Sequence, residues 1–101
     1  MTIEFHPEAE REFLDAIAFY RRERRDLGYE FGVEVNRTLE RILHSPDAWA
    51  PLTRRTRRCR TNRFPYGVVY QVRSDLLFIV SVMHLHRQPN SWRHGLARDE
   101  S

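Results

Sequence analysis

Residues 68–80 read VVYQVRSDLLFIV, and this stretch decides the fold. Two apolar runs flank the polar pair Ser74-Asp75, which is typical of a β-hairpin with a two-residue turn. The predicted strands cover residues 67–73 and 76–85. Because both runs are too apolar for a sheet exposed to water, we expect central strands that helices cover on at least one side.

Upstream of this hairpin the apolar pattern changes to a helical period. In residues 8–25 and 29–44 apolar side chains recur every three or four positions, which predicts two amphipathic helices. Pro7 suits the first position of the first helix, Gly28 is expected to break the chain between the two, and Ser45-Pro46 ends the second. So short a link favours an antiparallel helical hairpin whose apolar stripes face a common sheet.

Two further strands complete the predicted sheet. Ile3 and Phe5 alternate with polar neighbours, which predicts a short opening strand that buries one face. Residues 57–64 form the other strand, after an irregular connection at residues 46–56 in which Trp49 is expected to plug against the core. The predicted fold class is α+β: an N-terminal two-helix hairpin packed on a small, mostly antiparallel sheet of three to four strands.

Length and cysteine content limit the class of protein. At 101 residues the chain is expected to form a single domain, residues 1–101, with a flexible tail after about residue 95. Its one cysteine, Cys59, cannot form an intrachain disulfide, which indicates a reducing, cytoplasmic compartment. The charged start lacks the apolar core of a signal peptide, and the longest apolar run, Leu76 to Val80, predicts no membrane contact.

Charge is distributed unevenly along the chain. Residues 1–47 hold 11 acidic residues and 7 arginines, a balance of −4, whereas residues 48–101 hold 3 acidic residues and 10 arginines, a balance of +7. An uncompensated basic surface attracts acidic molecules. We therefore expect the basic second half to face a partner.

The densest basic cluster has six arginines within ten residues, and no acidic residue occurs between Ala48 and Ser74. In the predicted strand 57–64, alternation places Arg58 and Arg60 on one side. Two guanidinium groups there would clamp a phosphate of RNA or DNA, or equally the carboxylates of an acidic protein. The cluster comprises Arg54, Arg55, Arg57, Arg58, Arg60 and Arg63.

A second cluster follows the last predicted strand and contains His84, His86, Arg87 and Trp92. Alternation is expected to place both histidines on one face, where they could exchange protons with a phosphodiester while Arg87 stabilises developing charge. The alternative is that the histidines are half-buried and structural and that Trp92 caps the sheet edge. The His-x-His pair has no third ligand at recognisable spacing, so we expect neither a metal site nor a cofactor.

In their order along the chain, these parts resemble the RelE/ParE superfamily of type II toxins, which includes plasmid stabilisation proteins. The resemblance runs from the opening strand to about Trp92. It rests mainly on the segment Phe64-Pro65-Tyr66-Gly67-Val68-Val69-Tyr70 and on His84-x-His86-Arg87-x-Pro89-x-x-Trp92. It implies an α+β fold and a cognate antitoxin that wraps the toxin and masks its basic surface, with a heterotetramer as one form of the complex.

The superfamily has two known activities, and the residues that match it bear on both. RelE-like members cleave messenger RNA on the ribosome, and two of their basic positions fall on Arg58 and Arg60. However, an arginine of those nucleases falls on Gly67, and a second falls on Leu85 or, with a shift, on Arg87. Their terminal tyrosine has no clear counterpart, the nearest residues being Ser91 and Trp92.

This broken nuclease pattern favours the ParE-like group, whose members inhibit DNA gyrase by binding. The resemblance implies DNA gyrase as the target but locates no contact with it. From the residues themselves we select Arg58, Arg60, Arg63 and Trp92 as candidates for nucleic-acid or target binding. The alternative is a ribosome-dependent messenger RNA endonuclease with His84, His86 and Arg87 as catalytic residues. A second alternative is a non-toxic, nucleic-acid-binding accessory protein.

Overall fold

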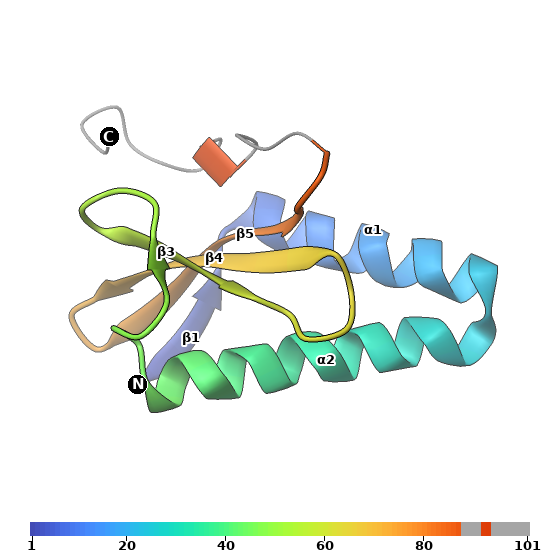
Figure 1. Ribbon diagram of the computed structural model, residues 1–101, viewed down its shortest axis with the longest axis horizontal. Helices are drawn as coiled ribbons and strands as arrows, with labels where there is room; N and C mark the ends of the chain where they lie inside the picture. Colours follow the sequence, from blue (N-terminus) through green and yellow to red (C-terminus); the bar gives the residue numbers. More distant parts are fainter. Residues whose placement is uncertain (88–91, 94–101) are drawn as a thin grey trace.

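Two antiparallel helices cover one face of a five-stranded sheet in the computed structural model, which describes residues 1–87, 92 and 93 (Figure 1). The strand order is β1-β5-β4-β3-β2, with β1 parallel to β5 and the other pairs antiparallel. In chain order the elements are β1 (Thr2–Phe5), α1 (Pro7–Glu23), α2 (Arg25–His44), β2 (Ala50–Pro51), β3 (Thr56–Arg60), β4 (Tyr66–Arg73) and β5 (Leu76–His84).

The α+β class is therefore confirmed, but the sheet has five strands rather than three to four. The additional strand, β2, is two residues long and pairs with Arg57 and Arg58 at the edge of the sheet. It lies within the predicted irregular connection, where so short a segment has no alternation to detect. The predicted flexible tail after about residue 95 lies outside the described residues.

The β4–β5 hairpin occupies the centre of the sheet, as predicted. Its turn residue Ser74 has a φ of 56°, in the left-handed region that tight hairpin turns use. A β-bulge interrupts the register between Val69 and Tyr70. Opposite it, Glu12 of α1 accepts hydrogen bonds from the Ser81 hydroxyl at 2.8 Å and the Val82 amide at 3.0 Å. The bulge thus provides the point at which α1 is tied to β5.

The helices differ from the prediction at their junction. Pro7 begins α1 as expected, and His6 Nδ1 caps it by accepting from the Glu8 amide at 3.0 Å. The break falls at the extended residue Arg24, not at Gly28, which lies in the first turn of α2. A Cβ atom on Gly28 would lie 2.9 Å from the Ile17 carbonyl oxygen of α1. Glycine is present there because the helices approach closely.

Buried side chains form one core on each face of the sheet. Under the helices, Tyr20, Phe31, Phe64 and Tyr66 pack with ring centroids 4.8–5.2 Å apart for the closest pairs, and Trp49 packs against this core as predicted. The opposite face carries a second core of Val69, Phe78, Val80, Met83 and Trp92. β1 buries less than expected, since Ile3 remains 39% exposed at the sheet edge.

The strand predicted at residues 57–64 is shorter, because β3 ends at Arg60. The Thr61 hydroxyl donates to the Phe64 carbonyl at 2.6 Å and the Thr61 amide donates to the Tyr66 carbonyl at 3.0 Å, which closes a loop between β3 and β4. Phe64 of this loop and Tyr66, the first residue of β4, insert their rings into the helix-side core. Within the described chain, neither helix is long and apolar enough to span a bilayer.

Candidate binding site

The basic strand β3 borders a pocket of about 700 Å³, here called the basic pocket. Alternation along β3 buries Cys59 in the helix-side core and leaves Arg58 and Arg60 on the pocket side, as the sequence predicts. None of the described residues that line it is acidic. Its walls are Arg41, Trp49, Ala50, Arg58, Arg60, Thr61, Asn62, Arg63, Phe64, Pro65, Leu85 and His86.

Gly67 determines how Arg58 lies in this pocket. A Cβ atom on Gly67 would sit 3.0 Å from both Cγ and Cδ of Arg58 and 3.2 Å from a methyl carbon of Leu85. The aliphatic stem of Arg58 therefore crosses the bare backbone of Gly67. Because Gly67 has no side chain, the Arg58 stem can pack directly against its backbone.

Helix α2 holds the C-terminal end of β3 through Arg41. Its Nη2 donates to the Thr38 hydroxyl at 2.9 Å and to the Arg60 carbonyl at 3.3 Å, and its Nη1 lies 3.7 Å from Cys59 Sγ. The same guanidinium lies 5.7 Å from the centre of the Trp49 ring. Arg41 thus belongs to the scaffold of the pocket and leaves Arg58 and Arg60 to face outward.

Two acidic residues of α2 balance part of the basic strand region. Glu34 is only 4% exposed, and its carboxylate accepts from the Asn62 amide at 2.5 Å and lies 3.9 Å from Arg41. Glu30 pairs with Arg63 at 2.9 Å. Arg63 lines the pocket but is engaged by this carboxylate, whereas no ion pair of Arg58 or Arg60 occurs among the described residues.

The other three arginines of the cluster lie at the opposite end of β3. Arg57 Nη1 donates to the Trp49 carbonyl at 2.8 Å. Arg54 and Arg55 line a separate pocket of about 260 Å³ with Asp47 and Tyr70. Burial raises the pKa of the Tyr70 phenol to about 12, and its hydroxyl donates to the Pro46 carbonyl at 2.5 Å. The six arginines therefore do not form one surface.

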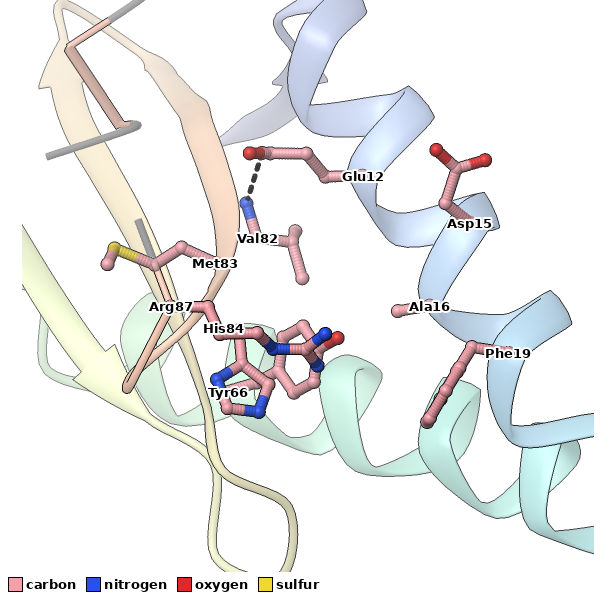
Figure 2. Close-up of a pocket in the computed structure, with 9 residues that line it drawn as sticks. All are labelled: Glu12, Asp15, Ala16, Phe19, Tyr66, Val82, Met83, His84 and Arg87. Carbon is pink, nitrogen blue, oxygen red and sulfur yellow. Dashed lines mark hydrogen bonds between the residues drawn. The ribbon is translucent and has the colours of Figure 1, made fainter. Parts of the chain in front are cut away.

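A further pocket of about 340 Å³, here called the α1 pocket, lies between α1 and the end of β5 (Figure 2). Glu12, Asp15, Ala16 and Phe19 come from α1, and the Glu12 carboxylate is tied to the Val82 amide across it. On the sheet side, the Arg87 guanidinium lies beside Tyr66 and His84 in the close-up. Acidic and basic groups thus face each other here, unlike in the basic pocket.

The two histidines do not share a face, which corrects the prediction. β5 ends at His84, so alternation does not extend to His86, and the chain turns back until the His86 amide donates to His84 Nδ1 at 3.1 Å. His84 lines the α1 pocket and His86 the basic pocket, although their ring centroids are 5.8 Å apart. Burial, with Arg87 and then His86 as further causes, lowers the pKa of His84.

Trp92 lies in the second core, where it is 5% exposed and packs with Val69, Phe78, Val80 and Met83. The guanidinium of Arg93 lies 4.3 Å from the centre of its ring. Trp92 lines neither pocket described above. Of the four residues selected for target binding, the structure thus brings together Arg58, Arg60 and Arg63 and places Trp92 apart from them.

Several residues that shape the site were not selected from the sequence: Glu34, Thr38, Arg41 and Trp49. Glu34, Thr38 and Arg41 follow the apolar stripe of α2 at helical spacing, and polar residues in such a stripe are a signal of buried hydrogen bonding. Across the described residues, no group of three His, Cys, Asp or Glu side chains gathers as metal ligands would.

Comparison with known proteins adds a family and a fold. Residues 3–89 match the family described as the ParE toxin of the type II toxin-antitoxin system parDE. A solved chain from the chromosomal ParDE toxin-antitoxin system of P. aeruginosa superposes with a TM-score of 0.71 at 10% sequence identity, covering 83% of this chain and 95% of that one. No curated protein sequence is significantly similar.

Proposed function

This chain belongs to the ParE toxin family of type II toxin-antitoxin systems, and we propose that it inhibits growth by binding its target and is neutralised by a cognate antitoxin. The proposed target is DNA gyrase, in line with the ParE-like group of the superfamily. Its proposed site of action is the cytoplasm, where both proposed partners would be found. A heterotetramer of two toxins and two antitoxins is the proposed neutralised form.

The observation that carries the binding mechanism is the close contact between Gly67 and Arg58. A nuclease of the superfamily has an arginine at the position of Gly67, but here even a Cβ atom would meet the Arg58 stem at 3.0 Å. The local packing therefore has room for the Arg58 side chain but favours no second arginine at position 67. Arg58 and Arg60 then serve as anchors for a partner rather than as parts of a catalytic set.

The histidines support the same conclusion. His84 Nδ1 accepts the His86 amide, so the neutral ring carries its proton on Nε2 and has no free lone pair to act as a base. The lowered pKa of His84, caused first by burial, favours this neutral form. A general base and a general acid for one phosphodiester would both have to reach the same bound substrate, whereas these two rings line different pockets.

A groove suited to the antitoxin runs beside the basic pocket. A second hollow of about 750 Å³ lies along the C-terminal part of α2 and shares Arg41, Trp49 and Asn62 with the basic pocket. The two hollows adjoin beside α2, and their walls are mainly apolar and basic, with Glu40 as an acidic residue of the second hollow. We propose that an acidic, amphipathic antitoxin segment lies along the two hollows, because its charge and apolar side chains complement both kinds of wall.

The test is induction of the protein in a bacterial host without antitoxin, followed by plasmid supercoiling analysis and messenger RNA cleavage mapping. We expect growth arrest, relaxed plasmids and intact transcripts, and restored growth when the antitoxin is co-expressed. Arrest with cleaved transcripts and normal supercoiling would instead establish the ribonuclease. Normal growth would favour the nucleic-acid-binding accessory protein.

The ribonuclease stays the second candidate because a histidine lies in the same pocket as the two arginines. Arg58, Arg60 and His86 line the same pocket, so a phosphate held by the arginines would lie on the same side of the molecule as an imidazole. Under this alternative Arg87 and His84 would act from the neighbouring α1 pocket. The matched test uses purified ribosomes and messenger RNA with the variant His86→Gln, which would abolish cleavage if His86 transfers a proton.

A further inference from the structure

The basic pocket holds two hydrogen-bond donors that lack acceptors. Trp49 Nε1 and Arg58 Nε are buried nitrogen atoms, and neither has a hydrogen-bond partner within the part of the chain that the structure describes. Both side chains line the same pocket. Buried donors are rarely left unpaired, because each loses its bonds to water without replacement. Two such donors around one hollow point to a ligand that supplies oxygen acceptors.

The surrounding contacts keep both side chains in place. The Trp49 carbonyl accepts from Arg57 at 2.8 Å, and the Arg41 guanidinium lies over its ring. The Arg58 stem packs against Gly67. Among the described residues no carboxylate pairs with either side chain, since Glu30 and Glu34 are engaged by Arg63 and by the Asn62 amide. Both donors therefore lack an acceptor among the described residues, and small rotations of the two side chains would expose them to a partner.

The walls of the pocket distinguish between the two common anions, carboxylate and phosphate. Beside its basic groups the pocket has apolar walls from Ala50, Phe64, Pro65 and Leu85. A peptide that carries an acidic residue next to apolar ones complements both kinds of wall, whereas a nucleic acid backbone brings only charge to them. Stacking of a base on Trp49 would have to compete with Arg41, which lies over that ring.

We propose that the basic pocket is a receptor for one aspartate or glutamate side chain of the antitoxin. The carboxylate enters beside Trp49 and Arg58, accepts from the indole N–H and from Arg58 Nε–H after small rotations of both side chains, and is flanked by Arg60. This inference rests on the proposed function, since it names the chemical group through which the antitoxin is recognised. It requires no metal and no covalent step.

The test is a ¹H–¹⁵N NMR titration of the wild-type protein with a blocked synthetic peptide, Leu-Asp-Glu-Leu-Asp-Glu-Leu. The indole signal of Trp49 and the Nε–H signal of Arg58, assigned by their loss in Trp49→Phe and Arg58→Lys, are expected to move downfield as hydrogen bonds form. The indole signal of Trp92 is the internal control and should stay in place, because that ring lies in the second core.

Two matched probes decide the chemistry. The peptide with Asn and Gln in place of Asp and Glu should leave both signals unmoved, and so should an oligothymidylate at the same phosphate concentration. Equal shifts with the neutral peptide, larger shifts with the oligonucleotide, or no shift with the acidic peptide would each overturn the proposal.

The variants give a second measure of the same contact. Arg58→Lys keeps the charge but removes the Nε–H donor, and we expect it to weaken peptide binding about tenfold, the usual effect of losing a hydrogen bond to a charged group. Arg54→Lys, at the other end of β3, is the control and should change binding less than about twofold. Equal losses in both variants would show unspecific charge attraction and refute the receptor.

Failure here is distinguishable from failure of the proposed function. Growth arrest that the antitoxin relieves, together with an unresponsive Trp49 signal, would leave the toxin assignment intact and place antitoxin recognition elsewhere. A responsive pocket in a protein that causes no growth arrest would support the carboxylate receptor and refute the toxin.

Discussion

The contact between the two helices around Gly28, here called the seam, differs from the basic pocket in how its groups are satisfied. At the seam, backbone and side chains approach so closely that Gly28 has no room for a Cβ atom. In the basic pocket, as far as the described residues show, two buried donors lack acceptors and no acidic side chain lines the walls. The first region is satisfied by contacts between the two helices, and we propose that a partner completes the second. Substitutions at the seam should therefore affect stability, and those in the pocket should affect binding.

The largest effect is expected at Glu34, which joins α2 to the loop that follows β3. Glu34→Ala removes the buried acceptor of the Asn62 amide and the carboxylate that lies 3.9 Å from the half-buried Arg41 guanidinium. We expect the free energy of unfolding in urea to fall by about 3 kcal/mol. Glu40→Ala, at an exposed position of the same helix, is the control. Similar losses in the two variants would show that Glu34 does not hold β3 to α2.

The seam itself is tested by alanine at its glycines. Gly28→Ala places a Cβ atom 2.9 Å from the Ile17 carbonyl oxygen and should cost about 2 kcal/mol of unfolding free energy. Gly32→Ala, with its nearest neighbouring atom at 3.9 Å, should instead stabilise by about 0.5 kcal/mol through helix propensity. The comparison fails if both variants shift the urea midpoint in the same direction.

Gly67→Ala should separate binding from stability. Its Cβ atom would meet the flexible stem of Arg58 rather than backbone, so the stem can move aside and the unfolding free energy should fall by only about 1 kcal/mol. Antitoxin affinity, measured by isothermal titration calorimetry, should nevertheless fall several-fold because Arg58 leaves its place. Unchanged affinity would mean that the position of Arg58 is unimportant.

The smallest effect is expected from the protonation of His84 in the α1 pocket. Burial, Arg87 and His86 lower the pKa of His84 from its ordinary value of 6.5. Because the unfolded chain then binds this proton more readily, the stabilising contribution is complete above pH 6.5 and is lost as the pH falls toward the lowered pKa. NMR titration should show Arg87→Gln raising this pKa and Arg93→Gln leaving it unchanged. An equal response to both would exclude Arg87 as a cause.

The sequence predicted the regular parts of the molecule because their signals are local. The apolar periods located both helices and the β4–β5 hairpin, and alternation put Arg58 and Arg60 on the same side. Gly28 was interpreted as a break because sequence shows the propensity of glycine but not the neighbouring helix. His84 and His86 were predicted to lie on one face because no sequence signal shows that β5 ends at His84.

The parts of the site that escaped prediction depend on partners far apart along the chain. Glu34 meets the Asn62 amide 28 residues away, and Arg41 meets the Arg60 carbonyl 19 residues away. No local pattern reports such a contact, although a polar residue within an apolar stripe indicates that one exists. The unpaired nitrogens of Trp49 and Arg58 became visible only with the structure.

The central claim, that the basic pocket is the binding surface of the toxin, is tested most directly with purified DNA gyrase. The measurement is inhibition of plasmid supercoiling by the wild-type protein, by the double variant Arg58→Gln with Arg60→Gln, and by the matched variant Arg54→Gln with Arg55→Gln. We predict that the wild type and the matched variant inhibit equally and that the pocket variant, equally stable in urea, inhibits at least about tenfold less. Full inhibition by the pocket variant would contradict the claim.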